Sequence, residues 1–500
     1  MKLKNRYIGL LMFTLMLSCS DEFLEVVPKG TALEDNYYKN EAEAYSGLVA
    51  AYDQIGKQSR GFENMIALLN AGSDDHLAGG GSASDGSQLQ AFSNYTISES
   101  NVATSYWSDF YQGIFRANTL LVKLPAIEMS ETIKSRFTAE AKTLRAIYYF
   151  ELVRLFKNIP LVTAPLETED FYSVLQANPN DIYIQIETDL MEAMPDLPIV
   201  LDLSNEAGRL TRGAAKALLG KVYLYQEKNA EAAVQLAEVN GTPGTTSAFG
   251  YELLDTFSDL WIVSNIYNSE SILEIAHTDK SNSSWGNWGF SNDEGNSLNV
   301  MVGPRGFVNR NGSAALDYAA GWGFNIITQN LFDAFNGDPR FESTIENIQG
   351  LANSNQVEYE ESYQNTGYYL KKFMPLKSDV STGGGETVLN YKQHTYMIRL
   401  ADTYLMEAEA LGGSGARAQV LLDAVRARVG LLPIPVSIDA IANERRLELA
   451  GEGHRWYDLV RTGKAAVALA SRGFIAGKNE IFPIPLSELE NTLLVQNPNY

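Results

Sequence analysis

The segment that most constrains the fold is a highly charged stretch near the C-terminus, residues 442–464. It carries four acidic and four basic side chains in its central part and keeps an apolar stripe that includes Leu447, Trp456 and Leu459. Side chains three or four positions apart on a helix lie next to each other, so the acids have arginines within reach. We therefore expect helices whose charges pair with one another while the apolar stripe packs on a scaffold.

The acids Glu448, Glu452 and Asp458 of this stretch also raise the possibility of a hydrolase. Catalytic carboxylates work as a pair only when their environments push their pKa values apart. Here arginines accompany each of the three acids. A structural network of ion pairs is therefore the favoured interpretation.

Composition narrows the class of protein. The 500 residues are 45% hydrophobic and 20% charged, which is typical of a globular chain with a large core. The net charge of −22 disfavours nucleic acid as a partner. One cysteine and four separated histidines exclude disulfides, cysteine-rich zinc sites and His-x-x-x-His metal sites. Since the familiar catalytic motifs are also absent, we expect no cofactor, no metal and no enzymatic activity.

Residues 1–18 have the pattern of a signal peptide. A basic start is followed by an apolar run over residues 8–17 that is too short to span a membrane. Met16-Leu-Ser-Cys19 resembles a bacterial lipobox, in which Cys19 would be diacylated and would anchor a tether, residues 19–39, to the membrane. The alternative is an ordinary secretory signal with an incidental cysteine.

Two regions have helical periodicity and form the expected scaffold. Residues 40–240 are the N-terminal helical half, and residues 391–500 are the C-terminal half. A helix over residues 140–157 should stop before Pro160. Residues 211–237 indicate a helix pair in which Gly220 and Tyr223 have the spacing of a tetratricopeptide repeat. A second pair over residues 391–429 makes divergent helical repeats the favoured architecture.

Residues 241–390 form a different kind of region, rich in glycine, asparagine and aromatics. Glu270 to Ile275 alternates like a short strand. Trp285, Trp288 and Trp322 follow, three of the six tryptophans of the chain. Because few aliphatic residues accompany them, we expect these rings to line a surface and to stack on the C–H faces of sugars. The alternative is that they hold an irregular insertion together.

Other candidate ligand contacts come from polar and aromatic residues. Tyr318 belongs to the same aromatic-rich segment, and Arg305 with Arg310 could offset the acidic surface locally. Asp74 and Asp75 open a glycine-rich segment, residues 72–101, that is expected to be a long loop. These two aspartates could bind sugar hydroxyls or calcium, or could simply cap a turn.

Eight stretches, in order, resemble the signatures of the SusD/RagB family of Bacteroidetes outer-membrane lipoproteins. They are residues 19–30 (CSDEFLEVVPKG), 107–118, 145–161, 210–225, 331–340, 398–410, 444–461, and the two terminal runs FPIP and QNPNY. The resemblance implies a mostly α, SusD-like fold, with a tetratricopeptide-type scaffold and a large loop-rich insertion. It also implies a surface-exposed glycan-binding protein, anchored to the outer membrane by its lipid, that delivers oligosaccharides to a SusC-like TonB-dependent transporter.

Two other functions stay open at the level of sequence. The same fold could capture peptide or another nutrient. A secreted glycosidase would need two carboxylates about 5–10 Å apart in a cleft. The aromatic-rich segment offers only Asp279, Asp293, Glu294 and Asp317 for that purpose.

Overall fold

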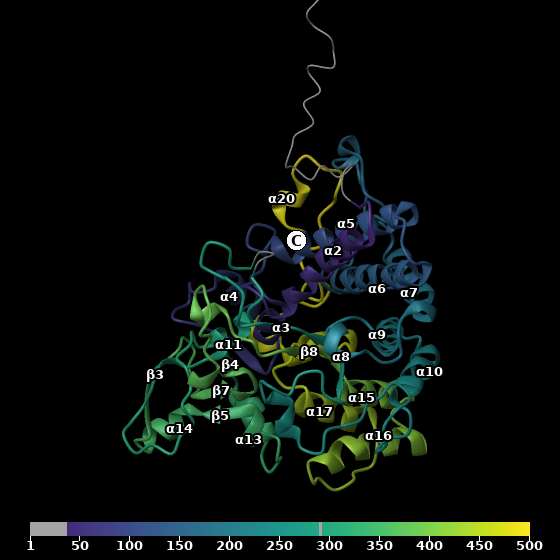
Figure 1. Cartoon of the computed structure of the whole chain (residues 1–500). Coiled ribbons are helices and arrows are strands. Elements are labelled where there is room, and N and C mark those ends of the chain that lie inside the picture. Colours follow the sequence, from purple (N-terminus) through teal and green to yellow (C-terminus); the bar gives the residue numbers. More distant parts are fainter. Residues whose placement is uncertain (1–37, 290–292) are drawn as a thin grey trace, which may run out of the picture.

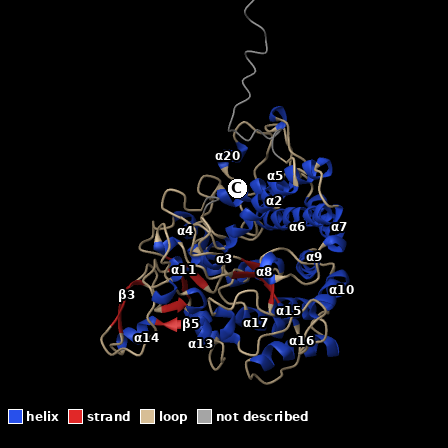
Figure 2. Ribbon diagram, in the orientation of Figure 1, coloured by secondary structure: helices blue, strands red, loops and turns tan. Residues whose placement is uncertain are grey.

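The computed structural model describes residues 38–289 and 293–500, so the expected signal peptide and Cys19 lie outside the described residues. The chain is mostly helical, with a few short strands (Figures 1 and 2). This confirms the predicted fold class. The longer helices gather on one side of the molecule, and most of the strands lie with loops and short helices on the other side (Figure 2).

The scaffold is a row of helices in which each packs on the next. In order, α5 packs on α6, α6 on α7, α7 on α9, α9 on α10, α10 on α15 and α15 on α16, and α2 packs on α5 (Figure 1). Their bounds are α2 (Glu41–Tyr52), α5 (Ser105–Lys123), α6 (Glu131–Phe156), α7 (Pro179–Ala193), α9 (Arg212–Tyr225), α10 (Asn229–Asn240), α15 (Leu400–Ala410) and α16 (Gly415–Arg428). Such stacking of helix pairs is the arrangement expected of a helical-repeat protein.

Local sequence explains the close packing of these pairs. A Cβ added to Gly220 on α9 would lie 2.6 Å from Cγ of Leu236 on α10. A Cβ on Gly113 of α5 would lie 2.5 Å from the ring of Tyr148 on α6. Glycine therefore lets both pairs approach closely, as the Gly220 spacing predicted. Helix α6 ends at Phe156, ahead of Pro160, also as predicted.

The region from residue 241 to residue 390 pairs its strands over long sequence distances. The part of the chain that the structure describes contains four sheets, each antiparallel and two-stranded. They are β1 (His76–Gly79) with β4 (Phe324–Ile327), β2 (Ser271–Ile275) with β8 (Thr395–Arg399), β3 (Arg305–Asn309) with β6 (Val357–Glu360), and β5 (Ile345–Asn347) with β7 (Tyr368–Leu370). The predicted strand at residues 270–275 is β2.

Short helices join or flank these strands and the scaffold helices. They are α3 (Met65–Ala71), α4 (Ser87–Ser93), α8 (Leu203–Glu206), α11 (Ser297–Val302), α12 (Gln329–Ala334), α13 (Phe341–Thr344) and α14 (Ile348–Asn353). The C-terminal part contains α17 (Ile438–Glu448), α18 (Arg455–Arg461), α19 (Ala465–Ala468) and α20 (Leu486–Leu489).

Residues 72–101 are not the single long loop that the composition predicted. They contain β1 and α4, because Leu89 and Phe92 are buried and Phe92 packs edge-on against Trp456 at 5.3 Å. The glycine-rich turn between them, residues 80–86, and the residues before β1 and after α4 are irregular.

The acids Glu444, Glu448 and Glu452 of the charged C-terminal stretch belong to what we call the ion-pair core. Their cations come from outside the stretch, which for these acids corrects the expectation that its charges pair with one another. Arg399 donates to Glu452 at 2.9 Å, to Glu270 at 2.8 Å and to Glu448 at 2.5 Å. Arg340 donates to Glu448 at 2.9 Å. The complete set is Arg340, Lys372, Arg399, Arg426 and Arg428 with Glu270, Asp338, Glu444, Glu448 and Glu452.

The ion-pair core is deeply buried, which explains its dense pairing. Glu448 and Arg399 are 0% and 1% exposed. Three arginines hold the pKa of the Glu448 carboxyl well below its usual value, although burial acts in the opposite direction. Removing one partner would leave an uncompensated buried charge, which is the costly case for such pairs.

The N-terminal half is attached directly to this C-terminal stretch. Asn70 at the end of α3 donates to the backbone oxygen of Gly451 at 2.8 Å and accepts from the backbone N–H of Gly453 at 3.2 Å. One continuous hydrophobic cluster also includes residues from α2 through to Ile484. The proposed division of the chain at residues 240 and 390 stays a prediction.

Candidate functional site

Three tryptophans of the insertion come together, and we call Trp285, Trp288 and Trp322 the tryptophan cluster. Trp285 and Trp322 are stacked, with ring centroids 6.1 Å apart and an interplanar angle of 30°. Trp288 stands edge-on to both, at 5.8 Å from Trp285 and 5.4 Å from Trp322. Trp285 is 56% exposed, so the cluster reaches the surface.

Two phenylalanines lie beneath the cluster. Phe62 has its ring 5.8 Å from Trp288 and 6.4 Å from Trp322. Phe324, at the start of β4, is buried and packs on Phe62 at 5.2 Å. Phe62 belongs to the N-terminal half, and no spacing or composition in the sequence connects it with tryptophans more than two hundred residues later.

Helix α11 fixes the position of two of the three rings. The indole N–H of Trp288 donates to Ser297 Oγ at 2.7 Å, and the same hydroxyl accepts from the backbone N–H of Gly61 at 2.9 Å. The backbone N–H of Trp322 donates to the carbonyl oxygen of Val300 at 2.9 Å. Fixed rings lose little entropy when a ligand binds, which suits a binding surface.

A buried aspartate supports the loop that carries Trp285 and Trp288. Asp293 accepts from Ser283 Oγ at 2.6 Å and from the backbone N–H groups of Gly289 at 2.8 Å and Gly295 at 3.3 Å. It is fully buried, and this burial raises the pKa of its carboxyl. Because three donors already occupy its oxygens, Asp293 shapes the loop and does not face a substrate.

Arg305 provides a polar group beside the aromatic surface. It is the first residue of β3, and its guanidinium donates to the backbone oxygen of Trp322 at 3.4 Å. A Cβ built on Gly81 would lie 3.1 Å from the same guanidinium, so the glycine turn passes close to it. The Arg305 side chain is 30% exposed and approaches Glu360 only to 3.9 Å. It therefore retains donors for a ligand.

Asp74 and Asp75 have a different role from the one predicted. Arg455 on α18 donates to both oxygens of Asp74 at 2.8 Å, and Arg446 on α17 donates to Asp75 at 2.8 Å. Asp75 is only 1% exposed. The two carboxylates attach the start of β1 to the C-terminal helices, and their oxygens face arginines.

Tyr318 lies inside the insertion, which corrects the expectation that its ring lines a surface. It is 1% exposed, packs edge-on against Phe307 at 5.6 Å and donates to Glu346 at 2.5 Å. Of the seven candidate contacts, the structure thus brings together Trp285, Trp288, Trp322 and Arg305.

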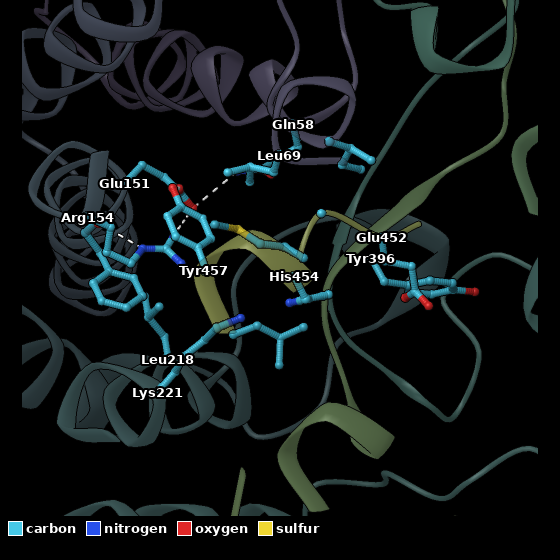
Figure 3. A pocket seen from close by; sticks show the side chains of 15 residues that line it. Gln58, Leu69, Glu151, Arg154, Leu218, Lys221, Tyr396, Glu452, His454 and Tyr457 are labelled. Carbon is cyan, nitrogen blue, oxygen red and sulfur yellow. Dashed lines mark hydrogen bonds and ion pairs between the residues drawn. The ribbon is translucent and has the colours of Figure 1, made fainter. Parts of the chain in front are cut away.

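Figure 3 shows a cavity inside the scaffold that is too small to be a glycan site. Its volume is about 30 Å³, enough for a water molecule but not for a sugar ring. Arg154 occupies its wall, 4.0 Å from the ring centre of Phe150 and 4.1 Å from that of Tyr457, and pairs with Glu151 at 2.5 Å. These contacts are those of a packed interior.

Two other acids of the insertion are paired with lysines. Asp279 pairs with Lys392 at 3.3 Å, and Asp317 pairs with Lys377 at 2.7 Å. Within residues 38–289 and 293–500, no group of three or more His, Cys, Asp or Glu side chains is placed to hold a metal ion. The same residues contain no helix with the length and hydrophobicity needed to cross a membrane.

Comparison with known proteins decides the family. The profile of the SusD family matches residues 269–500, and a second profile, described as starch-binding associating with outer membrane, matches residues 27–224. A solved structure named laminarin binding SusD-like protein is 62% identical, covers 93% of this chain and 100% of its own, and superposes with a TM-score of 0.91. The chain belongs to the SusD family.

Other members of the SusD family match over almost their full length. SusD-like protein P25 of Formosa agariphila is 26% identical over 99% of this chain and 98% of its own. Surface glycan-binding protein A of Bacteroides thetaiotaomicron, solved in complex with laminarihexaose, is 25% identical over 92% of this chain and 100% of its own, with a TM-score of 0.81. The recognised signatures are therefore confirmed from end to end.

Proposed function

We propose that this SusD-family chain binds laminarin-type glucan chains on the tryptophan cluster and releases them unchanged. The observation that carries the proposal is the stack of the half-exposed Trp285 on Trp322 at the surface of the insertion. A relative with 62% identity is named as laminarin binding, which supports this class of glycan.

The roles of the residues follow from their positions. The exposed ring of Trp285 offers an apolar face for the C–H face of a sugar, while Trp288 and Trp322 fix its orientation. Arg305, at the edge of the cluster, donates to sugar hydroxyls and sets the direction of the chain. An aromatic surface with few charges suits a neutral glucan better than a peptide or a polyanion.

The partners of the acidic side chains in the insertion are consistent with binding without catalysis. Asp293 is buried with three donors, and Asp279 and Asp317 pair with lysines. The two-carboxylate cleft that glycoside hydrolysis requires is not assembled from these three acids. We also infer that Cys19 carries a lipid that holds the protein on the exterior of the outer membrane, and that a SusC-like TonB-dependent transporter receives the glycan.

Isothermal titration of the chain from residue 20 onward would test the proposal. The ligands are laminarihexaose, cellohexaose and maltohexaose, with new reducing ends measured in the same samples. We expect saturable binding of laminarihexaose without release of reducing ends, and weaker binding of the other two. No binding of any hexaose would contradict glycan capture, and release of new ends would contradict the non-enzymatic function.

A further inference from the structure

A cavity of about 550 Å³ lies beside α2, close to the tryptophan cluster but separate from it. One wall is formed by Tyr45 and Val49 of α2 and by Asp53 at the start of the 3-10 helix Asp53–Gln58. The opposite wall is formed by Arg209 and by β2. The size is within the range of about 300–1,000 Å³ that is usual for ligand sites.

A second, smaller cavity extends the first. It has a volume of about 190 Å³ and shares Gly208, Arg209, Leu273 and Glu274 with the larger one. Val200 and Tyr267 also line it. We call the two cavities together the α2 trough. Because a helix rises about 1.5 Å per residue, Tyr45 and Asp53 lie about 12 Å apart along its wall.

Hydrogen bonds connect one end of the α2 trough with the tryptophan cluster. The Arg60 guanidinium donates to Asp53 at 2.6 Å, in the trough, and to the backbone oxygen of Asp293 at 3.3 Å. Asp293 supports the loop of Trp285 and Trp288, and the next residue, Glu294, lines the trough. The two sites thus lie on either side of Arg60.

The side chains in the trough suit a neutral, polyhydroxylated ligand. Tyr45 presents an aromatic ring that is 45% exposed. Arg116 is paired with Asp53, Arg209 with Glu140, and Glu274 with His394, so most of the charge in the trough is already balanced. The carboxylate of Glu294 makes no hydrogen bond or ion pair within the described residues. It is free to accept from a hydroxyl.

We propose that the α2 trough is a second carbohydrate subsite, which holds further sugar units of the glucan chain whose first units lie on the tryptophan cluster. The inference rests on the proposed function. Glu294 in the trough directly follows Asp293, which supports the loop of the tryptophan cluster, and this adjacency is what identifies the ligand as the same chain. Two subsites on one ligand act together, so affinity should increase with the length of the glucan.

The test compares a short and a long ligand, laminaritriose and polymeric laminarin, by isothermal titration. The variant combines Tyr45→Ala with Glu294→Gln, two exposed positions outside the tryptophan cluster. We expect it to bind polymeric laminarin about five- to tenfold more weakly than the wild type, with unchanged affinity for laminaritriose. Thermal unfolding of the variant checks that its fold is intact.

Tyr172→Ala is the matched control, because Tyr172 is 63% exposed on the loop between α6 and α7 and does not line the trough. It should leave both affinities unchanged. Unchanged polymer affinity in the Tyr45→Ala/Glu294→Gln protein would overturn the second subsite, and so would an equal loss for both ligands. If the wild type binds neither ligand, the proposed function itself fails.

Discussion

Charged side chains usually lie at the protein surface and large apolar ones in the interior. The ion-pair core and the tryptophan cluster depart from this rule in opposite ways. In the core, charged side chains such as Arg399 and Glu448 are 1% and 0% exposed. In the cluster, a large apolar ring, Trp285, is 56% exposed. Buried charge and exposed apolar surface are the informative exceptions in a folded protein. The comparison indicates that the first region serves stability and the second serves binding.

The strongest test of this division is Arg399→Ala. It leaves Glu270, Glu448 and Glu452 without their shared partner in the interior. We expect a loss of about 3–5 kcal/mol in the free energy of unfolding, measured by urea denaturation. Lys464→Ala is the control, because its pair with Asp439 is exposed and should contribute less than about 1 kcal/mol. An equal loss in the free energy of unfolding for the two substitutions would contradict a stabilising role of the ion-pair core.

Acid should weaken the interior more than the binding surface. Burial lowers the pKa of His76 and of His277 to about 3, whereas an unfolded histidine titrates near 6.5. Below pH 6.5 the unfolded chain therefore takes up protons that the folded chain does not, and stability falls as the pH falls. The expected loss is on the order of 1–2 kcal/mol for each histidine between pH 6.5 and pH 5.

Urea denaturation at pH 7.5, 6.5 and 5.0 measures this dependence, and His277→Gln should reduce its slope. The carboxylates of Glu448 and Glu452, whose pKa values are lowered by their cations, add to the loss below about pH 4.5. The indole rings do not titrate, so affinity for laminarihexaose should stay constant between pH 7.5 and 6.5. A stability independent of pH down to 5 would contradict the neutral, buried state of the two histidines.

Replacing an exposed ring should affect binding and not stability. Trp285→Ala is expected to weaken binding of laminarihexaose by about 1–3 kcal/mol, by analogy with stacking on other planar ligands. The unfolding temperature should stay within error of the wild type, because the ring is half exposed. Isothermal titration and thermal unfolding measure the two effects. Unchanged affinity would move the glycan site away from the tryptophan cluster.

The smallest expected effect is that of Asp293→Asn, which keeps the shape of the side chain but weakens its acceptors. The loop of Trp285 and Trp288 then loses part of its support from Asp293. We expect a two- to fivefold lower affinity, about 0.5–1 kcal/mol, together with a change in tryptophan fluorescence. Asp279→Asn is the control, since Asp279 makes a surface pair with Lys392. Identical fluorescence in both proteins would contradict a positioning role for Asp293.

Sequence patterns predicted the scaffold better than the site. Periodicity and the Gly220 spacing were sufficient to predict the helical repeats, because both patterns arise from contacts between segments that are neighbours in the sequence. A structural ion-pair network at the C-terminal stretch was also predicted, but its acids Glu444, Glu448 and Glu452 pair with cations outside the stretch. Its principal cation, Arg399, was not predicted, because it comes from β8, about fifty residues earlier. Periodicity describes one segment at a time and does not identify distant partners.

The candidate site shows the same limit. Composition identified Trp285, Trp288 and Trp322 as a group, since they share one short segment. It also favoured Asp74 and Tyr318, whose burial depends on Arg455 and Glu346. Phe62 was missed because no spacing or composition around it indicates a binding site. Only the fold places it under the cluster.

The contacts of Asn70 with Gly451 and Gly453 have a consequence for the order of folding. Helix α3 is made early in synthesis, yet its final partners are about 380 residues away along the chain. Contacts between such distant segments close large loops and slow the folding reaction. The part of α3 that packs on α18 therefore stays uncovered until the last tenth of the polypeptide has been made. The incomplete chain must be kept from aggregating until that moment.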